Sequence, residues 1–268
     1  MHILLLGATG NLGLRLLPAL LAHNHTVVAY IRSEPKLRSL ISPRLASLIT
    51  IHIGDALDTH AVEAALHQHG CDAVMNTAGN FAPPWREQYL GKIAESVSAA
   101  AVRVGRDRER EGGKVLRAWF IGGCTSLVYP FPGNDQGWKV QDFFPAWGSA
   151  HHRGTEEALR KVSKEELEWS LLCVGWMVPM SKVIDVLDCP QRHGLMVKVG
   201  EIPDWQGSWV GSLPLIGRTL DLFYCYFGEY TVKLEDVADL LAEDFESGGK
   251  KFVGCTVGYK DRGTVKSA

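Results

Sequence analysis

The sequence predicts an α/β protein built on a doubly wound parallel sheet. Short, uniformly apolar runs rich in β-forming residues recur through the first two thirds of the chain, as expected of strands covered by helices on both faces. Helical patterns fill the gaps between the runs, and this alternating order produces parallel strands. The expected strands are 3–6, 26–31, 49–53, 73–76, 115–121 and 170–174.

Helix signals lie between these runs. Leu12, Leu16 and Leu20 recur at a spacing of four, as the buried stripe of a helix requires. The charged stretch 106–114 is interpreted as a solvated helix end because its charges alternate in sign. Pro145 is suited to the first turn of a late helix. Helices are further expected over 61–68, 89–104 and from 145 to about 162.

No internal repeat or low-complexity linker divides the 268 residues, so we expect one unit over 1–268. Its core covers about 1–175, and a small C-terminal region of about 176–232 departs from the alternating order. That region combines glycine and proline with aromatic residues, which favours a pocket for a flat or apolar substrate. A plain core or a subunit interface is the alternative. The aromatic residues are Trp205, Trp209, Phe223, Tyr224, Tyr226 and Phe227.

Composition and charge exclude several classes of protein. With 46% hydrophobic and 22% charged residues, the chain is neither disordered, collagen-like nor a coiled coil. Its formal net charge of -2 gives no general electrostatic reason to bind nucleic acid or an anionic membrane, so a small molecule is the expected partner. The oligomeric state cannot be read from the sequence.

Cysteine usage and hydropathy favour a cytoplasmic location. The six cysteines lack the spacing of a zinc site or a dense disulfide framework, so we expect a reducing environment and no metal. Met1 is not followed by the basic segment and long apolar core of an export signal. The most lipid-like stretch, 212–228, contains Arg218 and Asp221, and the cost of burying these charges argues against a membrane span.

A glycine-rich turn, Gly7-Ala8-Thr9-Gly10-Asn11-Leu12-Gly13, follows the first expected strand and opens the first expected helix. Glycines let the backbone turn tightly and approach a pyrophosphate, while a helix N-terminus offers unpaired amide hydrogens and the positive end of its dipole. This context predicts a dinucleotide site. An ordinary strand-to-helix turn is the alternative. The expected cofactor contacts are Gly7, Thr9, Gly10, Asn11, Leu12 and Gly13.

The end of the second expected strand bears on the choice of dinucleotide. It reads Tyr30-Ile31-Arg32-Ser33, without the carboxylate that binds the ribose in NAD-preferring sites. A guanidinium can grip a 2'-phosphate in a bidentate manner, so Arg32, with donors from Ser33 and Lys36, favours NADP(H) over NAD(H). A surface arginine in a turn is the alternative.

Two further turns follow the third and fourth expected strands. Asp55 and Ala56 lie where an adenine is expected, and Asn76, Ala78 and Gly79 bring small residues and bare backbone toward the cofactor. Either segment alone is compatible with an ordinary turn. Three turns at successive strand ends are expected where the carboxyl edge of a parallel sheet forms a binding crevice.

Together these segments resemble the short-chain dehydrogenase/reductase superfamily, specifically its atypical branch of NmrA-like and NAD(P)H-binding, flavin-reductase-like proteins. The resemblance implies a Rossmann-type sheet with a small C-terminal substrate-binding region and chemistry at a nicotinamide ring. It does not by itself imply which reaction is catalysed. The segments that carry it are 7–13, 32–36, 54–55, 76–79, 156–160, 167–170 and 232–238.

The chain departs from the superfamily's usual catalytic residues, a Tyr and a Lys spaced YxxxK beside a Ser at the end of the fifth strand. No YxxxK occurs anywhere in the sequence, and Trp147 and His151 stand at that spacing in the expected helix. Proton donation by the usual tyrosine is therefore unsupported.

Other residues are candidates for the chemistry. Imidazole titrates near neutrality, and only one of the neighbours His151 and His152 can point squarely at a nicotinamide from a helix; polar helix positions without a catalytic role are the alternative. Thr125 and Ser126, after the fifth expected strand, are candidates to bind a substrate oxygen. Tyr129 either offers a phenol from another direction or packs in a loop.

The motifs and the resemblance together predict an NADP(H)-dependent oxidoreductase of the atypical short-chain type. Its expected substrate is small and aromatic or polyketide-like. The missing YxxxK keeps open a redox-neutral isomerase or cyclase on the same fold. A nonenzymatic NADP(H)-binding sensor, which the NmrA-like resemblance permits, is the third hypothesis.

Overall fold

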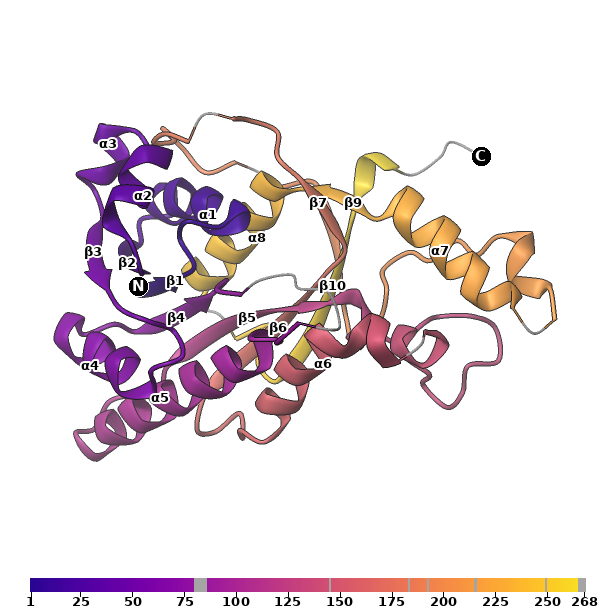
Figure 1. Cartoon of the computed structure of the whole chain (residues 1–268), viewed down its shortest axis with the longest axis horizontal. Coiled ribbons are helices and arrows are strands. Elements are labelled where there is room, and N and C mark those ends of the chain that lie inside the picture. Colours follow the sequence, from indigo (N-terminus) through magenta and orange to yellow (C-terminus); the bar gives the residue numbers. More distant parts are fainter. Residues whose placement is uncertain are drawn as a thin grey trace.

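One eight-stranded sheet organises the chain, in the order β3-β2-β1-β4-β5-β6-β10-β8 (Figure 1). This computed structural model describes residues 1–79, 86–144, 146–182, 184–191, 193–214, 216–248 and 250–264, except for the side chains of 146–151, 224–229 and 264. Pairing is parallel from β3 through β6 to β10, and β8 pairs antiparallel with β10. The strands are β1 (His2–Leu6), β2 (Thr26–Ile31), β3 (Thr50–Ile53), β4 (Ala73–Asn76), β5 (Arg117–Gly123), β6 (Glu168–Val174), β8 (Leu195–Val199) and β10 (Cys255–Asp261).

Two layers of helices cover the sheet (Figure 1). On one face α1 packs against α8, with α2 and α3 beside them, and on the other face α5 packs between α4 and α6. Leu16 and Leu20 of α1 are fully buried, which confirms the predicted apolar stripe. The helices are α1 (Asn11–Ala22), α2 (Glu34–Leu40), α3 (Pro43–Ala46), α4 (Thr59–His69), α5 (Leu90–Arg110), α6 (Ala146–Arg160) and α8 (Leu234–Glu246).

The doubly wound sheet that the sequence predicts is confirmed in strands β1 to β6. Because helices cover both faces, every residue from Ile3 to Leu6 is fully buried, and the run is apolar throughout instead of alternating. The chain adds β2 and β3 on one side of β1, then crosses to β4 and continues outward through β5 and β6. The strand order therefore reverses between β1 and β4, where ligands bind at the carboxyl ends of open parallel sheets.

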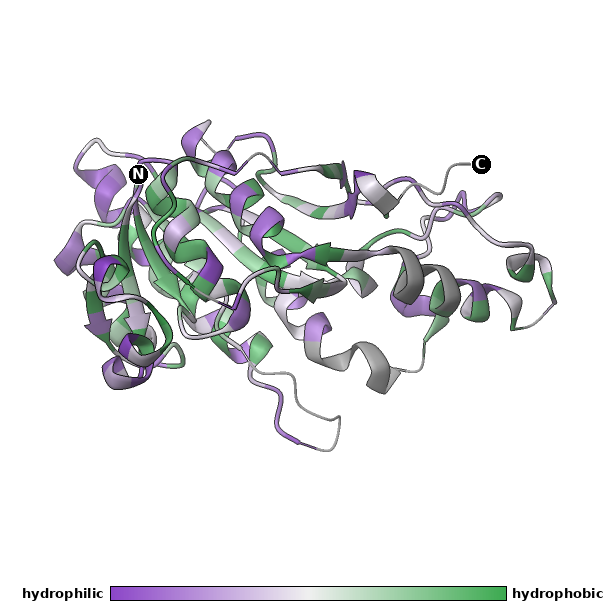
Figure 2. Cartoon of the chain, turned by 90° about the horizontal axis from the view of Figure 1, so that it is seen from above, coloured by the Kyte–Doolittle hydropathy of each residue, from purple (hydrophilic) through white to green (hydrophobic). Residues whose placement is uncertain are grey.

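The region after β6 has more regular structure than the sequence predicts. It contains a two-stranded sheet of β7 (Trp176–Val178) and β9 (Thr231–Lys233), together with β8 and helix α7 (Gly217–Glu229). Helix α7 is not predicted because its glycines suggest breaks, but Gly217 and Gly228 both lie at its ends. It projects from the body of the molecule (Figure 2). None of the described helices has both the length and the apolar character needed to cross a membrane.

A buried carboxylate holds the base of α7. Asp221 is 2% exposed, and its two oxygens accept hydrogen bonds from the Tyr129 hydroxyl (2.7 Å) and from the Ser208 amide (2.7 Å). These bonds tie α7 to the segment after β5 and to the short helix η3 (Trp209–Ser212) that precedes it.

A buried ion pair joins β5 to α8. Arg117 is 1% exposed and donates to Asp244 Oδ2 at 2.9 Å, and Trp119 Nε1 donates to the same oxygen at 2.8 Å. Burial lowers the pKa of Arg117, although the neighbouring Asp244 carboxylate favours the charged form. Breaking such a pair by removing one partner is costly, because the other charge stays buried without compensation.

We expect Asp244→Ala to lower the free energy of unfolding by about 3–5 kcal/mol, because it strands the Arg117 guanidinium in the core. Urea denaturation measures the loss. Glu95→Ala is the matched control, since it breaks an exposed pair with Lys161 and should cost far less. Equal losses in the two variants would contradict the importance of the buried pair.

Candidate functional site

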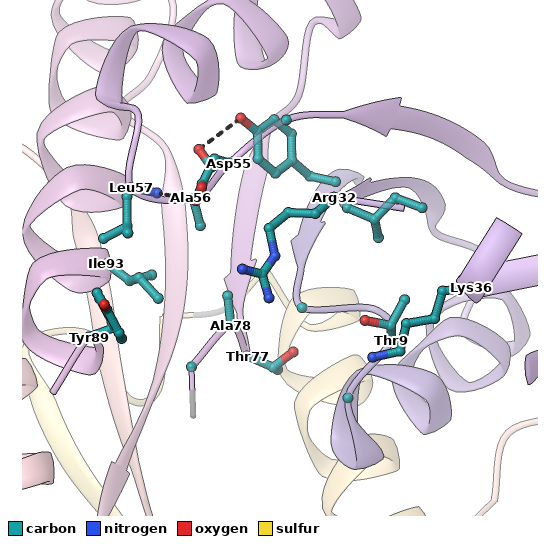
Figure 3. A pocket seen from close by; sticks show the side chains of 16 residues that line it. Thr9, Arg32, Lys36, Asp55, Ala56, Leu57, Thr77, Ala78, Tyr89 and Ile93 are labelled. Atoms are coloured by element: carbon teal, nitrogen blue, oxygen red, sulfur yellow. Dashed lines mark hydrogen bonds between the residues drawn. The ribbon is translucent and has the colours of Figure 1, made fainter. Parts of the chain in front are cut away.

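A cavity of about 500 Å³ opens at the carboxyl ends of β1 to β4 (Figure 3). Its walls are formed by the turns after these four strands and by the start of α5. The cavity therefore lies at the reversal of strand order. Its lining residues are Gly7, Thr9, Gly10, Tyr30, Ile31, Arg32, Lys36, Gly54, Asp55, Ala56, Leu57, Thr77, Ala78, Gly79, Tyr89 and Ile93.

The glycine-rich turn forms the floor of the cavity and needs two of its glycines for close packing. Gly7 has a left-handed φ of +82°, and a Cβ there would lie 2.6 Å from the Ala78 nitrogen. A Cβ at Gly13 would lie 2.2 Å from the Gly7 carbonyl oxygen. Gly10 precedes α1, and no side chain caps this helix, so the amide groups of its first turn are oriented to receive an anion.

Two cations line the part of the cavity next to β2. Arg32 directly follows β2, and Lys36 lies in the first helical turns of α2. In Figure 3 the Arg32 guanidinium points into the cavity and Lys36 extends toward Thr9. Both residues are exposed, and neither forms an ion pair with another residue in the described part of the chain. Their positive charges are thus available to an anionic group.

A buried tyrosine shapes the part of the cavity next to β3. Tyr30 is 2% exposed, donates a hydrogen bond to the Asp55 carbonyl oxygen (3.1 Å), and has a pKa raised to about 12 by burial. Gly54 is needed here, because a Cβ would lie 2.2 Å from the Tyr30 hydroxyl. Asp55 Oδ1 accepts a hydrogen bond from the Leu57 amide (3.0 Å), which fixes the turn that lines the cavity.

Several lining residues are not predicted from the sequence. Tyr30 lies one position before the end of β2, where a large side chain looks like ordinary core. Tyr89 and Ile93 come from the start of α5, and their spacing of four is the only signal that they share a helix face. Their contribution depends on how α5 packs, which the local sequence does not specify.

Five of the predicted cofactor contacts lie beside the cavity without lining it. Leu12 is buried in the core, and Ser33 caps α2 by accepting a hydrogen bond from the Lys36 amide (3.4 Å). Asn76 Oδ1 accepts a hydrogen bond from the Ala78 amide (3.1 Å) and so shapes the turn after β4. These residues support the site through backbone geometry. The five are Asn11, Leu12, Gly13, Ser33 and Asn76.

Three of the candidate catalytic residues, His152, Thr125 and Ser126, lie at the carboxyl end of β5. His152 of α6 is half-buried, and a Cβ on Gly123 would lie 2.3 Å from its ring, so the imidazole packs on the last residue of β5. Thr125 and Ser126 form the short helix η1 (Cys124–Ser126) that follows. The side chain of His151 lies outside the described residues. His152, Thr125 and Ser126 are not among the described residues that line the 500 Å³ cavity.

Ser126 faces a buried carboxylate. It is 1% exposed, and the nearby Glu156 is 6% exposed and bonded to Lys139 and Arg160. Burial opposes ionisation of Glu156, but Lys139, Ser126 and Arg160 outweigh this effect and hold its pKa below the ordinary value. Thr125 Oγ1 is also buried, and it has no hydrogen-bond partner among the described residues.

Tyr129 packs inside a cluster of aromatic side chains. It is 1% exposed, packs against Phe131, Phe143 and Trp205, and donates its hydroxyl hydrogen to Asp221. Because Asp221 is distant in sequence, nothing near Tyr129 in the chain indicates this bond. The placement corresponds to the loop-packing alternative, since the hydroxyl is committed to a buried carboxylate. Within the described residues, no group of three His, Cys, Asp or Glu side chains is arranged to hold a metal ion.

We expect Gly7→Ala to weaken NADPH binding at least about tenfold, or roughly 1.4 kcal/mol, because the new Cβ pushes the turn away from the Thr77–Ala78 backbone. Calorimetric titration measures the affinity. Gly112→Ala is the matched control: it has the same φ of +82° but open space around its Cβ, so it carries the backbone strain without disturbing the cavity. Wild-type affinity in Gly7→Ala would refute the role of the turn.

Comparison with known proteins agrees with this geometry. The sequence model of a family described as NAD(P)H-binding matches residues 7–183. A solved structure from Lactobacillus casei has a TM-score of 0.65 at 16% identity, covering 97% of this chain and 99% of that chain. A short-chain dehydrogenase/reductase from Veillonella parvula in complex with NADP has a TM-score of 0.59 at 16% identity, covering 98% and 95%. An anaerobilin reductase from Escherichia coli O157:H7 has a TM-score of 0.56 at 17% identity, covering 96% and 97%.

No curated protein matches the chain by sequence. At these identities the solved structures show a shared fold, and the family match covers the glycine-rich turn, the two cations and the turns after β3 and β4. The chain therefore belongs to the NAD(P)H-binding family.

Proposed function

We propose that this protein is a cytoplasmic NADP(H)-dependent oxidoreductase acting on a small, aromatic or polyketide-like substrate. The observation that carries the proposal is that one cavity combines the glycine-rich turn with Arg32 and Lys36. A dinucleotide whose pyrophosphate rests at the start of α1 would place its adenosine ribose beside β2 and these two cations. A 2'-phosphate distinguishes NADP from NAD, and Arg32 and Lys36 have the charge to bind it.

The remaining lining residues fit the other parts of such a cofactor. Asp55 and Leu57 offer a polar group and an apolar surface to the adenine, and Ala78 and Gly79 leave space for the chain of the cofactor to pass toward β5. The Veillonella relative, which was solved with NADP, supports the same choice of cofactor. The absence of a carboxylate at the end of β2 is consistent with it.

The reaction needs only a few groups from the protein. When bound, the reduced nicotinamide would supply a hydride, and the protein must exclude water, orient the acceptor and deliver one proton. We assign proton donation to His152, which packs on the end of β5, with His151 or solvent as the alternative source. Thr125 is assigned to the substrate oxygen, because a buried hydroxyl without a partner gains a hydrogen bond when that oxygen binds.

Three outcomes of a turnover assay separate an oxidoreductase from the two rival functions. Consumption of NADPH that depends on an added acceptor supports an oxidoreductase, and the name of the anaerobilin reductase relative makes anaerobilin the first acceptor to try. Product formation without any loss of NADPH would identify an isomerase or cyclase. A cofactor-dependent protein partner, with no turnover of any small molecule, would identify a sensor.

If Arg32 binds the 2'-phosphate, Arg32→Asp should weaken NADPH binding about 10- to 100-fold, as expected for loss of a charge-assisted hydrogen bond, and should leave NADH binding much less affected. Titration calorimetry with both cofactors measures the ratio. Arg38→Asp makes the same charge change on α2 at a residue that does not line the cavity, and it should alter neither affinity appreciably. Equal losses for NADPH and NADH would remove the assignment.

If His152 donates the proton, His152→Ala should lower turnover about 100-fold, the usual effect of losing a general acid, with NADPH affinity unchanged. The rate of NADPH oxidation with a quinone or flavin acceptor measures it. His60→Ala removes a histidine that is 87% exposed and should have no effect. A wild-type rate in His152→Ala, with a large loss in His151→Ala, would transfer the role to the neighbouring histidine.

A further inference from the structure

The chain leaves β6 directly beside the candidate catalytic segment. Gly123 of β5 pairs with Val174 of β6, so η1 and Trp176 leave neighbouring strands at the same level of the sheet edge. Neighbouring strands lie about 4.8 Å apart. In the strand order β5 and β6 follow β4, and this part of the edge therefore continues the cofactor cavity on the side away from β3.

Every second residue of this segment is an exposed apolar side chain. Trp176 is 61% exposed, Val178 is 39% exposed and Met180 is 64% exposed. Met177, between them, packs against the core on the α1 and α8 side. Since successive residues of a strand face opposite ways, Trp176 and Val178 share the face that points away from that core.

A network of hydrogen bonds fixes this segment to helix α1. Glu235, at the start of α8, accepts hydrogen bonds from the backbone amides of Met180 (2.9 Å) and Ser181 (3.1 Å) and from Arg15 Nε (3.2 Å). The same Arg15 guanidinium donates to the Ser181 carbonyl (2.7 Å) and to the Asn11 carbonyl (3.0 Å). Arg15 thus joins the segment after β7 to the first turn of α1. Figure 1 shows the chain continuing from β7 across toward α3.

The network also constrains the charge state of its carboxylate. Burial opposes ionisation of Glu235, but the amides of Met180 and Ser181, together with Arg15, outweigh it and hold the pKa of this carboxyl below its ordinary value. An ionised carboxylate therefore holds the backbone at Met180 and Ser181. The side chains of Trp176, Val178 and Met180 stay exposed although the backbone beside them is fixed to the body of the protein.

The size of the exposed face favours a small molecule over a second protein chain. A large apolar side chain buries at most about 150–250 Å². Three such side chains, each partly covered already, fall well short of the roughly 800 Å² per partner that a stable protein interface needs. Trp176 offers one broad planar surface, which complements a flat conjugated ring system.

We infer that Trp176, Val178 and Met180 form the apolar wall of the substrate site, and that Trp176 selects flat, conjugated acceptors by stacking on them. The inference rests on the proposed function, because it assigns the substrate side of the same site. Segment η1 leaves the neighbouring strand at the same level as Trp176, so the proposed site would hold the oxygen of an acceptor near η1 and its planar apolar body against Trp176.

The test uses menadione, a planar naphthoquinone, and the full chain loaded with NADP⁺ so that no turnover occurs. Calorimetry gives the menadione affinity of the wild type, Trp176→Ala, Trp176→Phe and Trp209→Ala, and NADPH affinity is measured in parallel. Trp209 is the matched control because it is 77% exposed but lies on η3, the short helix that precedes α7. We expect Trp176→Ala to weaken menadione binding about tenfold and Trp176→Phe to weaken it less, as loss of an aromatic contact predicts.

Unchanged menadione affinity in Trp209→Ala and unchanged NADPH affinity in all variants complete the expected result. The inference is overturned if Trp176→Ala binds menadione as the wild type does, if Trp209→Ala loses as much, or if the wild type binds no menadione. Binding in the expected pattern without NADPH oxidation by menadione would leave the wall in place and remove the proposed hydride transfer.

Discussion

The contact between two turn backbones at the end of the sheet is the constraint on which the site depends. The turn after β1 passes so close to the turn after β4 that a Cβ on Gly7 would lie 2.6 Å from the Ala78 nitrogen. Gly13 then lets α1 pack closely against the turn after β1, since a Cβ on Gly13 would lie only 2.2 Å from the Gly7 oxygen. Because β1 and β4 are neighbours where the strand order reverses, this contact sets the position of the helix N-terminus within the crevice.

The central strands could be predicted from the sequence because each lies between two helical layers and must be apolar at almost every position. Strands β8 and β10 could not. β10 carries Lys260, which is 1% exposed, and only the fold shows that Asp204 neutralises it. Arg117 is likewise buried at the start of β5, and its partner Asp244 comes from α8, far along the chain. A charged residue can be buried in a strand when it has a partner of opposite charge. When that partner is distant in the sequence, the local pattern does not reveal it.

In the candidate site, too, some residues can be predicted from local sequence and others depend on contacts between distant segments. Residues that act through the backbone or stand at strand ends, such as Gly7, Arg32 and Asp55, follow from local sequence, and the cavity contains them. Tyr30 and the residues from α5 line the cavity because of packing between separate elements. Tyr129 shows what local sequence cannot predict. Its hydroxyl donates a hydrogen bond to Asp221, 92 residues away, and this bond holds the side chain in the packed interior. Two positive charges thus lie at the β2 end of the crevice, and exposed apolar side chains follow β6.

The claim that a dinucleotide occupies this crevice is tested most directly by titrating the wild-type protein with NADPH and NADH in a calorimeter. The geometry of the two cations predicts saturable binding of NADPH, at least about tenfold tighter than binding of NADH. Absence of any heat of binding with either cofactor would contradict the account, because the glycine-rich turn and the cavity above it would then have no dinucleotide to hold.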